Sequence, residues 1–510
     1  MPATPANFDA IPSVTSVALG PTRIDPSAGL APRSVVTITL ADHTWGDIDT
    51  DPYRTTRAYS PEDVGTYWGK FQSRNPYYIG RPMRILTGYV AEAPAWANFQ
   101  SRLYVLDKIE GPDAKGQVRI TGKDVLKLAD DARSQCPRAV TATLTAAITG
   151  TPATFAIASP AADLALFPAS GWVVIDSEIV AYSSRATGTF TISGRGQLGT
   201  VSANHDAAAK VGIVKYWNAL KPDIIIADLL TNFTPTNPAY LPTADWASEV
   251  GDWLPGVTYT AVITEPTGVN KLMQELLQQS TCFSWWDERV SQIKLKAIRP
   301  PRTEEVTTLT DDNFLRGSVS VTQSTDERLS RVVVYYGKKN PTIKDDEVTN
   351  YAGIYVYADA DAESATEYGD VRVKTVLSRW IPDAATATLL ANRTLARFRN
   401  PTIKVRFALD AKDGALWAGD IANVTTRYIQ DFSGAPVTSY AQVTEASEKE
   451  SGTRFEYEAS LSFFTGRYAY ITPDSQPDYL AATEAQRLRY GFICTDAGLM
   501  SNGDAPYKVI

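Results

Sequence analysis

The sequence is poor in the side chains that build disulfide frameworks, metal sites and base catalysts. Its 510 residues contain only three cysteines and two histidines. Cys136, Cys282 and Cys494 are odd in number, lie far apart and form no C-x-x-C pair. They therefore support neither a disulfide framework nor a zinc site. Cys282, in an apolar strand, is expected to be a buried thiol.

Positive charge and long apolar runs are also missing. The net charge of −8 and the pI near 5.1 give no general attraction to nucleic acid. No run of about 18 apolar residues occurs, so no membrane span is predicted. The N-terminus lacks the basic stretch and apolar core of a signal peptide, so synthesis in a cytoplasm is expected.

What is abundant favours strands and turns. The hydrophobic share of 44% and the charged share of 21% are those of a folded protein. The chain also holds 32 glycines, 31 prolines and many Thr, Val and Tyr residues, which favour a strand-and-turn protein over a helical one. At roughly 150 residues each, about three domains are expected.

The stretch from Asp383 to Phe463 predicts the fold class. Asp383 can cap a helix whose apolar stripe is Ala387, Ala391, Leu395 and Phe398, and Asn400-Pro401 ends it. Alternating residues then predict strands over 403–409 and 455–463, and a further strand is expected over 416–421. A helix lying across antiparallel strands predicts an α+β barrel or sandwich, in a protein that is mainly β with some α.

Composition changes divide the chain. Residues 1–32, rich in Pro, Ala, Ser and Thr, are expected to form an extended arm. The first domain takes residues 1–137 and 214–300, with helices predicted over 123–133, 222–230, 243–253 and after Thr267, and a hairpin within 283–297. Residues 138–213, almost free of Lys and Glu, predict an inserted small β module. A second domain takes residues 301–470, and a C-terminal extension takes 471–510.

Two segments resemble ligand-binding loops but lack residues that such loops need. Asp47, Asp49 and Asp51 alternate as in a calcium loop, but Pro52 and Ala58 replace the glycine and glutamate that such a loop needs, so an acidic surface loop is favoured. The glycine-rich run from Gly194 to Thr200 lacks the lysine and helix of a phosphate loop. It is interpreted as turn chemistry.

The segment from Gly65 to Pro82 is dense in aromatic and basic residues. Such interleaving is found where single-stranded nucleic acid stacks, and also where aromatics fill an oligomer interface while arginines pair with neighbouring acids. The acidic chain favours the interface. The candidate interface residues are Tyr67, Trp68, Arg74, Tyr77, Tyr78 and Arg81.

Four stretches together resemble the baseplate hub, or tail-tip, proteins of long-tailed (siphovirus-like) bacteriophages. They are Asp51-Pro-Tyr-Arg with Tyr67-Trp-Gly-Lys and Asn75-Pro-Tyr-Tyr-Ile-Gly-Arg81; the helix and hairpin from Thr267 to Ile298; Leu395-Ala-Arg-Phe with Leu416-Trp-Ala-Gly-Asp-Ile; and Ile175-Asp-Ser-Glu-Ile-Val-Ala-Tyr with Gly194-Arg-Gly-Gln-Leu-Gly-Thr.

The resemblance implies two hub-type β-barrel domains in a homotrimer, whose six similar positions join a sixfold tail tube to a threefold tip. It implies partners among distal tail, tail-tip or central-fibre, and tape-measure proteins. It places the chain in the virion, at the distal end of the tail, with DNA only passing through. Some lambda-type relatives carry an iron–sulfur cluster, but three scattered cysteines cannot supply four ligands, so we expect no cofactor.

Three functions are weighed. In a structural hub around a DNA channel, acidic walls would repel phosphates. A cell-wall hydrolase would need a catalytic pair, yet only His43 and His205 could serve as bases of the usual kind, and no G-x-S-x-G or H-E-x-x-H accompanies them. A receptor or glycan binder would use exposed Trp or Tyr, which mostly fill cores and interfaces. The hub is favoured, and no enzyme activity is expected.

Overall fold

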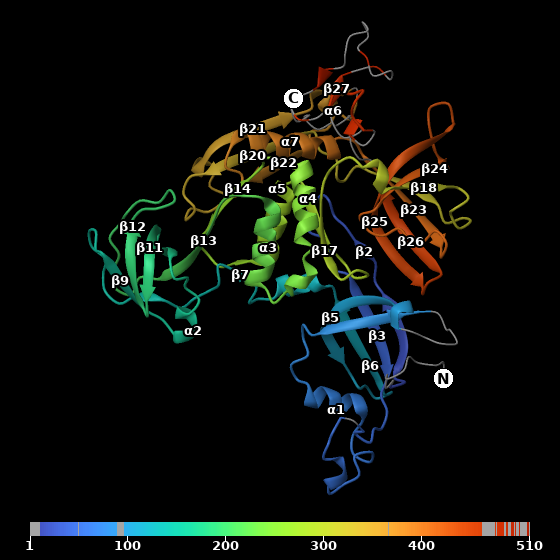
Figure 1. Cartoon of the computed structure of the whole chain (residues 1–510), viewed down its shortest axis with the longest axis horizontal. Coiled ribbons are helices and arrows are strands. Elements are labelled where there is room, and N and C mark those ends of the chain that lie inside the picture. The colour runs from blue at the N-terminus through green and yellow to red at the C-terminus, as the bar shows by residue number, and fades with distance from the viewer. Residues whose placement is uncertain are drawn as a thin grey trace. The chain divides into compact units, whose positions relative to one another are not determined.

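The computed structural model describes residues 11–48, 50–88, 96–365 and 367–461, together with residues 475, 477–483, 486, 487, 491–493, 495, 499, 507 and 508. Two compact units, Met1–Ser462 and Phe463–Ile510, divide the chain. The predicted class is confirmed, because the chain is mainly β with some helix and contains two curled, half-barrel sheets (Figure 1).

The first half-barrel is a five-stranded antiparallel sheet with the order β1-β3-β6-β5-β4. Alternating side chains build it: in β3, Val36, Ile38 and Leu40 are buried and their neighbours are half exposed. The strands are β1 (Val14–Leu19), β3 (Val35–Ala41), β4 (Pro82–Thr87), β5 (Gln100–Glu110) and β6 (Gln117–Lys123). The connection from β3 to β4 carries η1 (Arg54–Thr56) and α1 (Tyr67–Arg74), and η2 (Trp96–Asn98) precedes β5.

The expected N-terminal arm is extended, but it is built into two sheets. β1 forms the edge of the first half-barrel, and β2 (Thr22–Arg23) adds to a strand of the second half-barrel. The Ala31 amide then donates to the Ser284 carbonyl at 3.0 Å. The arm therefore ties distant parts of unit one together. Its first ten residues lie outside the described residues.

The module sheet continues into its host. Its order is β14-β13-β10-β11-β12-β9-β8, and its strands are β8 (Thr143–Leu144), β9 (Thr154–Ala158), β10 (Gly171–Ile175), β11 (Glu178–Ala186), β12 (Thr189–Gly194), β13 (Val211–Leu220) and β14 (Tyr259–Ile263), with α2 (Ala161–Leu164) beside them. β10 and β11 pair as an antiparallel hairpin within the predicted β module. β13 pairs with β10 through residues 211–214 and with β14 through residues 215–220. One strand thus crosses the predicted boundary at 213–214.

The largest hydrophobic core lies around three helices. These are α3 (Pro222–Phe233), α4 (Thr243–Trp253) and α5 (Val269–Gln279), packed with the hairpin of β16 (Cys282–Asp287) and β17 (Gln292–Ala297). The apolar stripe predicted after Thr267 is buried, including Leu272, Met273 and Leu276 at 0% exposure. β7 (Gln135–Cys136), β15 (Thr267–Gly268) and η4 (Pro238–Tyr240) complete this region.

The second half-barrel has the order β18-β24-β25-β26-β23-β19, with β2 added to β25. Its strands are β18 (Val306–Thr310), β19 (Ser320–Ser324), β23 (Thr402–Asp410), β24 (Ile421–Gln430), β25 (Pro436–Glu450) and β26 (Arg454–Ser460), and η5 (Thr303–Glu305) precedes them. The strand expected over 403–409 is confirmed by β23. The strand expected over 455–463 is β26 up to Ser460, and Phe463 lies outside the described residues.

A three-stranded sheet and a helix are inserted between strands of the second half-barrel. The sheet order is β21-β20-β22, from β20 (Arg331–Lys338), β21 (Tyr351–Ala358) and β22 (Val373–Leu377), with η6 (Val348–Asn350) and α6 (Ala360–Glu363). α7 (Ala384–Phe398) is capped as predicted, since the Asp383 carboxylate accepts from the Thr386 amide at 2.8 Å. α7 packs on β20 and β21, within the core of α3–α5. The expectation that it lies across the strands of 403–463 is therefore wrong.

Two further elements differ from the sequence prediction. Residues 416–420 form a turn and not a strand, because Gly419 has φ +90° and the Trp417 amide donates to the Asp420 carboxylate at 2.7 Å. The helix predicted over 123–133 is a 3-10 helix, η3 (Val125–Asp130). The Asp124 carboxylate accepts from the Ser34 amide at 2.8 Å and does not cap η3.

In the second unit, β27 (Phe492–Ile493) pairs with β28 (Tyr507–Lys508). Among the helices of the described part of the chain, none is both long and apolar enough to cross a membrane.

Candidate functional site: interaction surfaces and buried ionic networks

The connection between β3 and β4, residues 42–81, forms a projection that we call the α1 lobe (Figure 1). The Asp42 carboxylate accepts from the Trp68 amide at 2.9 Å and so ties the start of α1 to the end of β3. Aromatic rings pack behind it, with centroids 5.0 to 6.4 Å apart: His43, Trp45, Tyr67, Trp68 and Phe71. Through Trp68 and Phe71 this aromatic cluster packs against the core of the first half-barrel.

The acidic loop of the lobe is occupied by ion pairs. Asp47 binds Arg74 at 2.9 Å and lies 3.5 Å from Lys70. The Arg74 hydrogen bond holds the pKa of Asp47 below its ordinary value. Asp51 pairs with Arg57, and Asp49 lies outside the described residues. The Arg74–Asp47 pair is an arginine–acid contact of the kind expected of the segment from Gly65 to Pro82.

The six candidate interface residues divide into two groups. Tyr67 packs on its aromatic neighbours in the lobe, Trp68 and Tyr78 pack against the core of the first half-barrel, and Arg74 binds Asp47. Tyr77, at 85% exposure, and Arg81 lie at the surface. Sequence reasoning missed the other exposed apolar side chains of the lobe, which are Ile48, Tyr53, Tyr59, Val64 and Ile79. Bulky apolar residues in a loop without alternation are the signal that could have found them.

A second apolar surface lies on β20–β22. One face packs into the core through Val332 and Val334. The opposite face, which we call the outer face, carries Val333, Tyr335, Ile354, Val356, Val373, Thr375 and Leu377, placed on one side by the strand register. Ile354, Val356 and Val373 are 51%, 50% and 49% exposed. A sheet face this apolar and this open is typical of an interaction site.

A third surface is the turn of the β24–β25 hairpin. The Asp431 carboxylate accepts from the Ser433 and Ala435 amides at 2.8 and 3.0 Å and shapes the turn. Phe432 stands at the tip, fully exposed, and Tyr428 and Tyr440 on the two strands are about half exposed. A shaped turn that presents an aromatic ring to solvent is suited to insertion into a partner.

Distant segments meet at a buried ionic junction. Arg102 of β5 binds Glu288, from the β16–β17 turn, at 3.0 Å and also pairs with Glu448 of β25. Thr22 of β2 donates to both Glu288 oxygens at 2.8 and 2.9 Å. Burial raises the pKa of Glu288, although Arg102 opposes that shift. This junction links the arm, the first half-barrel and the second.

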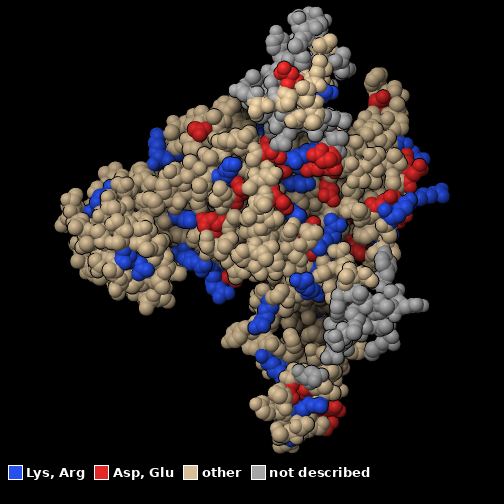
Figure 2. Space-filling view, viewed as in Figure 1, with Lys and Arg blue, Asp and Glu red and all other residues tan. Residues whose placement is uncertain are grey.

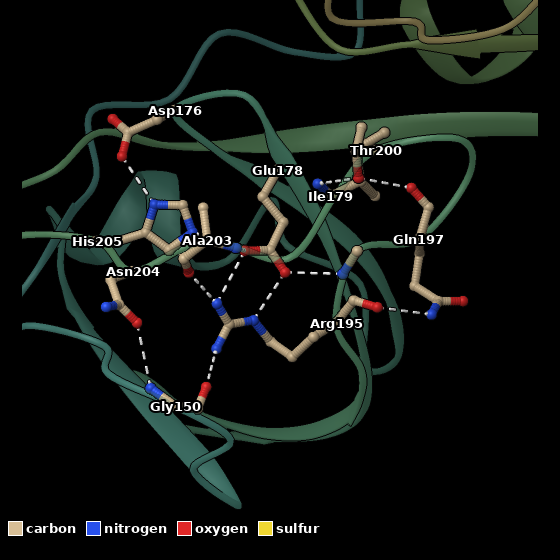
Figure 3. A network of polar contacts seen from close by, with 11 residues as sticks. Gly150, Asp176, Glu178, Ile179, Arg195, Gln197, Thr200, Ala203, Asn204 and His205 are labelled. Atoms are coloured by element: carbon tan, nitrogen blue, oxygen red, sulfur yellow. Dashed lines mark hydrogen bonds and ion pairs between the residues drawn. The ribbon is translucent and has the colours of Figure 1, made fainter.

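The inserted module holds a second buried network, drawn in Figure 3. Both oxygens of Glu178 accept from Arg195, at 2.7 and 2.8 Å, and the Gly196 and Ala203 amides add bonds of 2.7 and 2.9 Å. The His205 ring lies between Glu178 and Asp176, with both ring nitrogens within 2.9 Å of a carboxylate oxygen. The ring thus bridges the two acids. Burial alone raises the pKa of Glu178, but these donors bring it to about 2.

The network shapes the glycine-rich run. Gly196 and Gly199 have φ of +60° and +86°, in agreement with turn chemistry. A Cβ on Gly199 would lie 1.9 Å from the Lys339 carbonyl oxygen, so only glycine fits. Thr342 also donates to the Ser177 carbonyl at 3.4 Å. The module therefore touches the loop after β20 through this run.

The side chains that could act as catalysts are engaged elsewhere. His43 contacts the Ser13 hydroxyl and the Thr44 carbonyl, each at 3.0 Å, and His205 belongs to the Glu178 network. Cys282 is buried as expected, and burial raises its thiol pKa to about 12. Within the described residues, no three His, Cys, Asp or Glu side chains gather to hold a metal ion.

Two hollows on the second half-barrel are lined by ion pairs. Their volumes are about 320 and 440 Å³. Arg23 and Glu445 line both and pair with each other at 2.9 Å. Arg406 and Glu458 also line both and pair at 2.7 Å. Neither hollow contains a histidine or a cysteine among its lining residues. Ion pairs on a sheet face are typical of an ordinary protein surface.

No protein-family model matches the chain, and no curated protein sequence matches it. Solved structures do. A 43 kDa tail protein of prophage MuSo2 from Shewanella oneidensis is 10% identical, with a TM-score of 0.39, covering 87% of this chain and 93% of that one. A prophage tail protein, gp18, from Listeria monocytogenes is 10% identical, with a TM-score of 0.37, covering 90% and 92%.

A tail protein from Neisseria meningitidis is 13% identical, with a TM-score of 0.38, and the match covers 87% of this chain and 96% of that one. The resemblance to phage tail proteins that the sequence motifs indicated thus recurs among solved structures. Because these TM-scores lie below 0.5, we infer function below from the chain's own surfaces.

Proposed function

We propose that this chain is a structural hub subunit of a phage tail, which assembles as a homotrimeric ring at the distal end of the tail. The ring would join the sixfold tube to the threefold tip and surround the channel through which DNA leaves. Its neighbours would be distal tail, tail-tip or central-fibre, and tape-measure proteins.

The observation that carries this proposal is the number of separate contact surfaces on one chain. The α1 lobe, the outer face of β20–β22 and the tip of the β24–β25 hairpin each expose large apolar side chains, and together they hold 12 of the 28 exposed large apolar residues among the described ones. An enzyme concentrates its chemistry in one cleft. Several apolar surfaces on different elements suit a subunit that touches several neighbours.

Charge supports a structural role as well. Figure 2 shows acidic and basic side chains interleaved over the region of α6 and α7, where Arg399 binds Asp359 and Glu367, and Arg331 binds Glu363. Such pairing leaves no broad basic surface in that region to retain passing DNA. Hydrolase chemistry is not favoured, because both histidines are held in structural contacts.

Native mass spectrometry of the purified full-length chain, alone and with tail partners, tests the proposal. The expected result is a trimer, or a trimer formed once a neighbouring tail protein is added. An image of the phage particle with a tagged copy should then place three copies at the end of the tube. A strict monomer in both samples, or a single copy on the tail axis, would overturn the proposal.

A further inference from the structure

Two of the exposed surfaces match each other in apolar character and in charge. We propose that the α1 lobe of one copy docks on the outer face of β20–β22 of a second copy. The occupant of that face is thus another molecule of this chain. The inference deepens the proposed ring and rests on it.

The outer face offers an apolar floor. Its central rows run across three strands: Val356, Val333 and Thr375 form one row, and Ile354, Tyr335 and Leu377 form the next. The inner side of the same strands is already buried in the core. A sheet with one face in the core and an open apolar face on the other side lacks a covering layer.

The loop at one end of this floor carries two exposed acids without a cation partner in the described part of the chain. Tyr351 lies with its ring centroid 5.8 Å from that of Tyr335, and its hydroxyl donates to the Asp345 carbonyl at 2.8 Å. This chain of contacts places the loop that holds Asp345, Asp346 and Glu347 beside the Tyr335 row. Asp345 is paired with Lys338 and Arg379. Asp346 and Glu347 are exposed, and no cation of the described residues lies within ion-pair distance of either.

The α1 lobe offers the complement. Arg74 at the end of α1 binds Asp47 and also stabilises the charge of Asp51, so the loop that carries Tyr53 and Tyr59 lies beside this end of the helix. Tyr77 and Ile79 follow directly and are 85% and 70% exposed. The apolar side chains of the lobe therefore gather around the C-terminal end of α1.

Basic residues stand among these side chains. Arg54 follows Tyr53, and the Arg81 guanidinium donates to the Tyr77 carbonyl at 3.0 Å. Both arginines are exposed and have no acidic partner within ion-pair distance among the described residues. Arginine beside tyrosine is the composition that interface centres favour. Facing Asp346 and Glu347 of a second copy, these arginines would fix the orientation of the apolar contact.

The two surfaces are different patches on one chain, so the contact between copies is heterologous. A heterologous contact forms a closed ring when its rotation closes. Each copy in such a ring would use its lobe on one neighbour and its outer face on the other. The outer face of every copy would then be covered.

Disulfide cross-linking between two differently tagged copies tests this contact. One full-length copy carries Tyr77→Cys and the other carries Ile354→Cys, both with Cys494→Ser, while the buried Cys136 and Cys282 stay. Mild oxidation is expected to give a cross-linked pair that carries both tags. The matched control replaces Ile354→Cys by Val201→Cys, an 81% exposed position on the inserted module, and is expected to give at least tenfold less product.

A charge exchange supplies an independent readout. Arg81→Glu should weaken association about tenfold or more, and Glu347→Lys in the same chain should restore it, because the opposite charges then face each other again. Trimers that form without the specific cross-link and tolerate Arg81→Glu would overturn this contact and leave the proposed ring standing. Absence of any oligomer, with or without tail partners, would overturn both.

Discussion

The chain buries two ionic networks around a glutamate, and they differ in how the glutamate is satisfied. Glu178 receives a bidentate arginine, two backbone amides and a histidine, all from within 27 residues along the chain. Glu288 receives one hydroxyl, one arginine and one backbone amide, its own, and Arg102 is shared with Glu448. Burial penalises both carboxylates. Only Glu178 has enough donors to reverse that penalty, so its pKa falls to about 2, whereas the pKa of Glu288 is raised.

The Glu178 network is therefore local, whereas the Arg102 junction connects segments that lie far apart in the sequence. The Glu178 network closes one loop of the module and holds it against the turn after β20. The Arg102 junction joins segments 186 and 346 residues apart. A well-satisfied network stabilises its own loop, while a sparsely satisfied one depends on three segments staying together. The junction is therefore the weaker point under any change that moves the half-barrels.

Arg102→Gln is expected to have the largest effect. It removes the single cation that serves two buried carboxylates, and breaking a buried pair from one side costs about 3 to 5 kcal/mol. We expect the upper end of that range in the free energy of local opening, measured by hydrogen exchange of the segments around β2 and the β16–β17 turn.

The matched control for Arg102 is Arg23→Gln. Arg23 pairs with Glu445 of β25, the strand that also carries Glu448, but is half exposed. Exposed pairs contribute about 0 to 1 kcal/mol, so little change is expected. Equal losses for Arg102→Gln and Arg23→Gln would contradict the assignment of Arg102 as a junction.

Glu178→Gln should rank next. The amide keeps the size of the side chain but turns one acceptor oxygen into a donor that faces Arg195 and two backbone amides. A pKa of about 2 against an ordinary value of 4.5 corresponds to roughly 3 kcal/mol. Hydrogen exchange of the segment 171–205 measures the loss of protection.

Asp176→Asn tests whether burial decides this cost. Asp176 contacts the same histidine as Glu178, but its side chain is 55% exposed. Water can replace the lost contact there, and a change below about 1 kcal/mol is expected. A loss as large as that of Glu178→Gln would show that His205, and not Arg195, holds the loop.

Gly199→Ala separates steric contact from backbone strain. Gly199 and Gly434 have the same φ of +86°. A Cβ at Gly199 would collide with the Lys339 carbonyl, while nothing lies within 4 Å of a Cβ at Gly434. Gly434→Ala should therefore cost about 1 to 2 kcal/mol from backbone strain alone, and Gly199→Ala should cost more. Thermal unfolding and hydrogen exchange of the module would show the difference, and equal costs would mean that the loop after β20 moves freely away.

Local order was largely predictable from the sequence. Alternation gave β23 and β26, and the Asp383 cap and apolar stripe gave α7, because each signal lies within a few residues of the element that it shapes. The prediction of turns over Gly194–Thr200 is also confirmed. The sheet on which α7 packs was not predictable, because its apolar stripe would fit either β20–β21 or β23–β26. In the structure it packs on β20 and β21.

The ionic networks were mostly out of reach of sequence reasoning. Arg102, Glu288 and Glu448 lie hundreds of residues apart and each looks like an ordinary surface charge. Glu178 did leave a signal, because it and Asp176 are the two acids inside the otherwise mostly apolar run 172–182 of a module with few charges. Burial of that strand requires cationic or amide partners, and the nearby Arg195 and His205 are the obvious ones.

Acidification is expected to change the contributions of Glu288 and Glu178 to stability in opposite directions. This is the smallest of the predicted effects. The raised pKa of Glu288 means that the folded chain binds that proton more readily than the unfolded chain does. Its contribution to stability is fully present below the unfolded pKa of about 4.3 and falls as the pH rises through the folded value. The lowered pKa of Glu178 works the other way: its contribution is fully present above about pH 4.5 and is lost as the pH falls through about 2.

Comparison of the parent chain with Glu178→Gln and Glu288→Gln from pH 2 to 7 measures both slopes, using hydrogen exchange corrected for the intrinsic rate at each pH. The free-energy difference between parent and Glu178→Gln should rise from pH 2 to about 4.5 and then stay flat, because the ionised carboxylate is what Arg195 binds. The difference between parent and Glu288→Gln should fall as the pH rises above about 4.3, because the parent then carries a poorly satisfied buried charge that the amide avoids. Parallel curves would mean that the two glutamates are equally well satisfied, and the distinction between a local and a long-range network would fail.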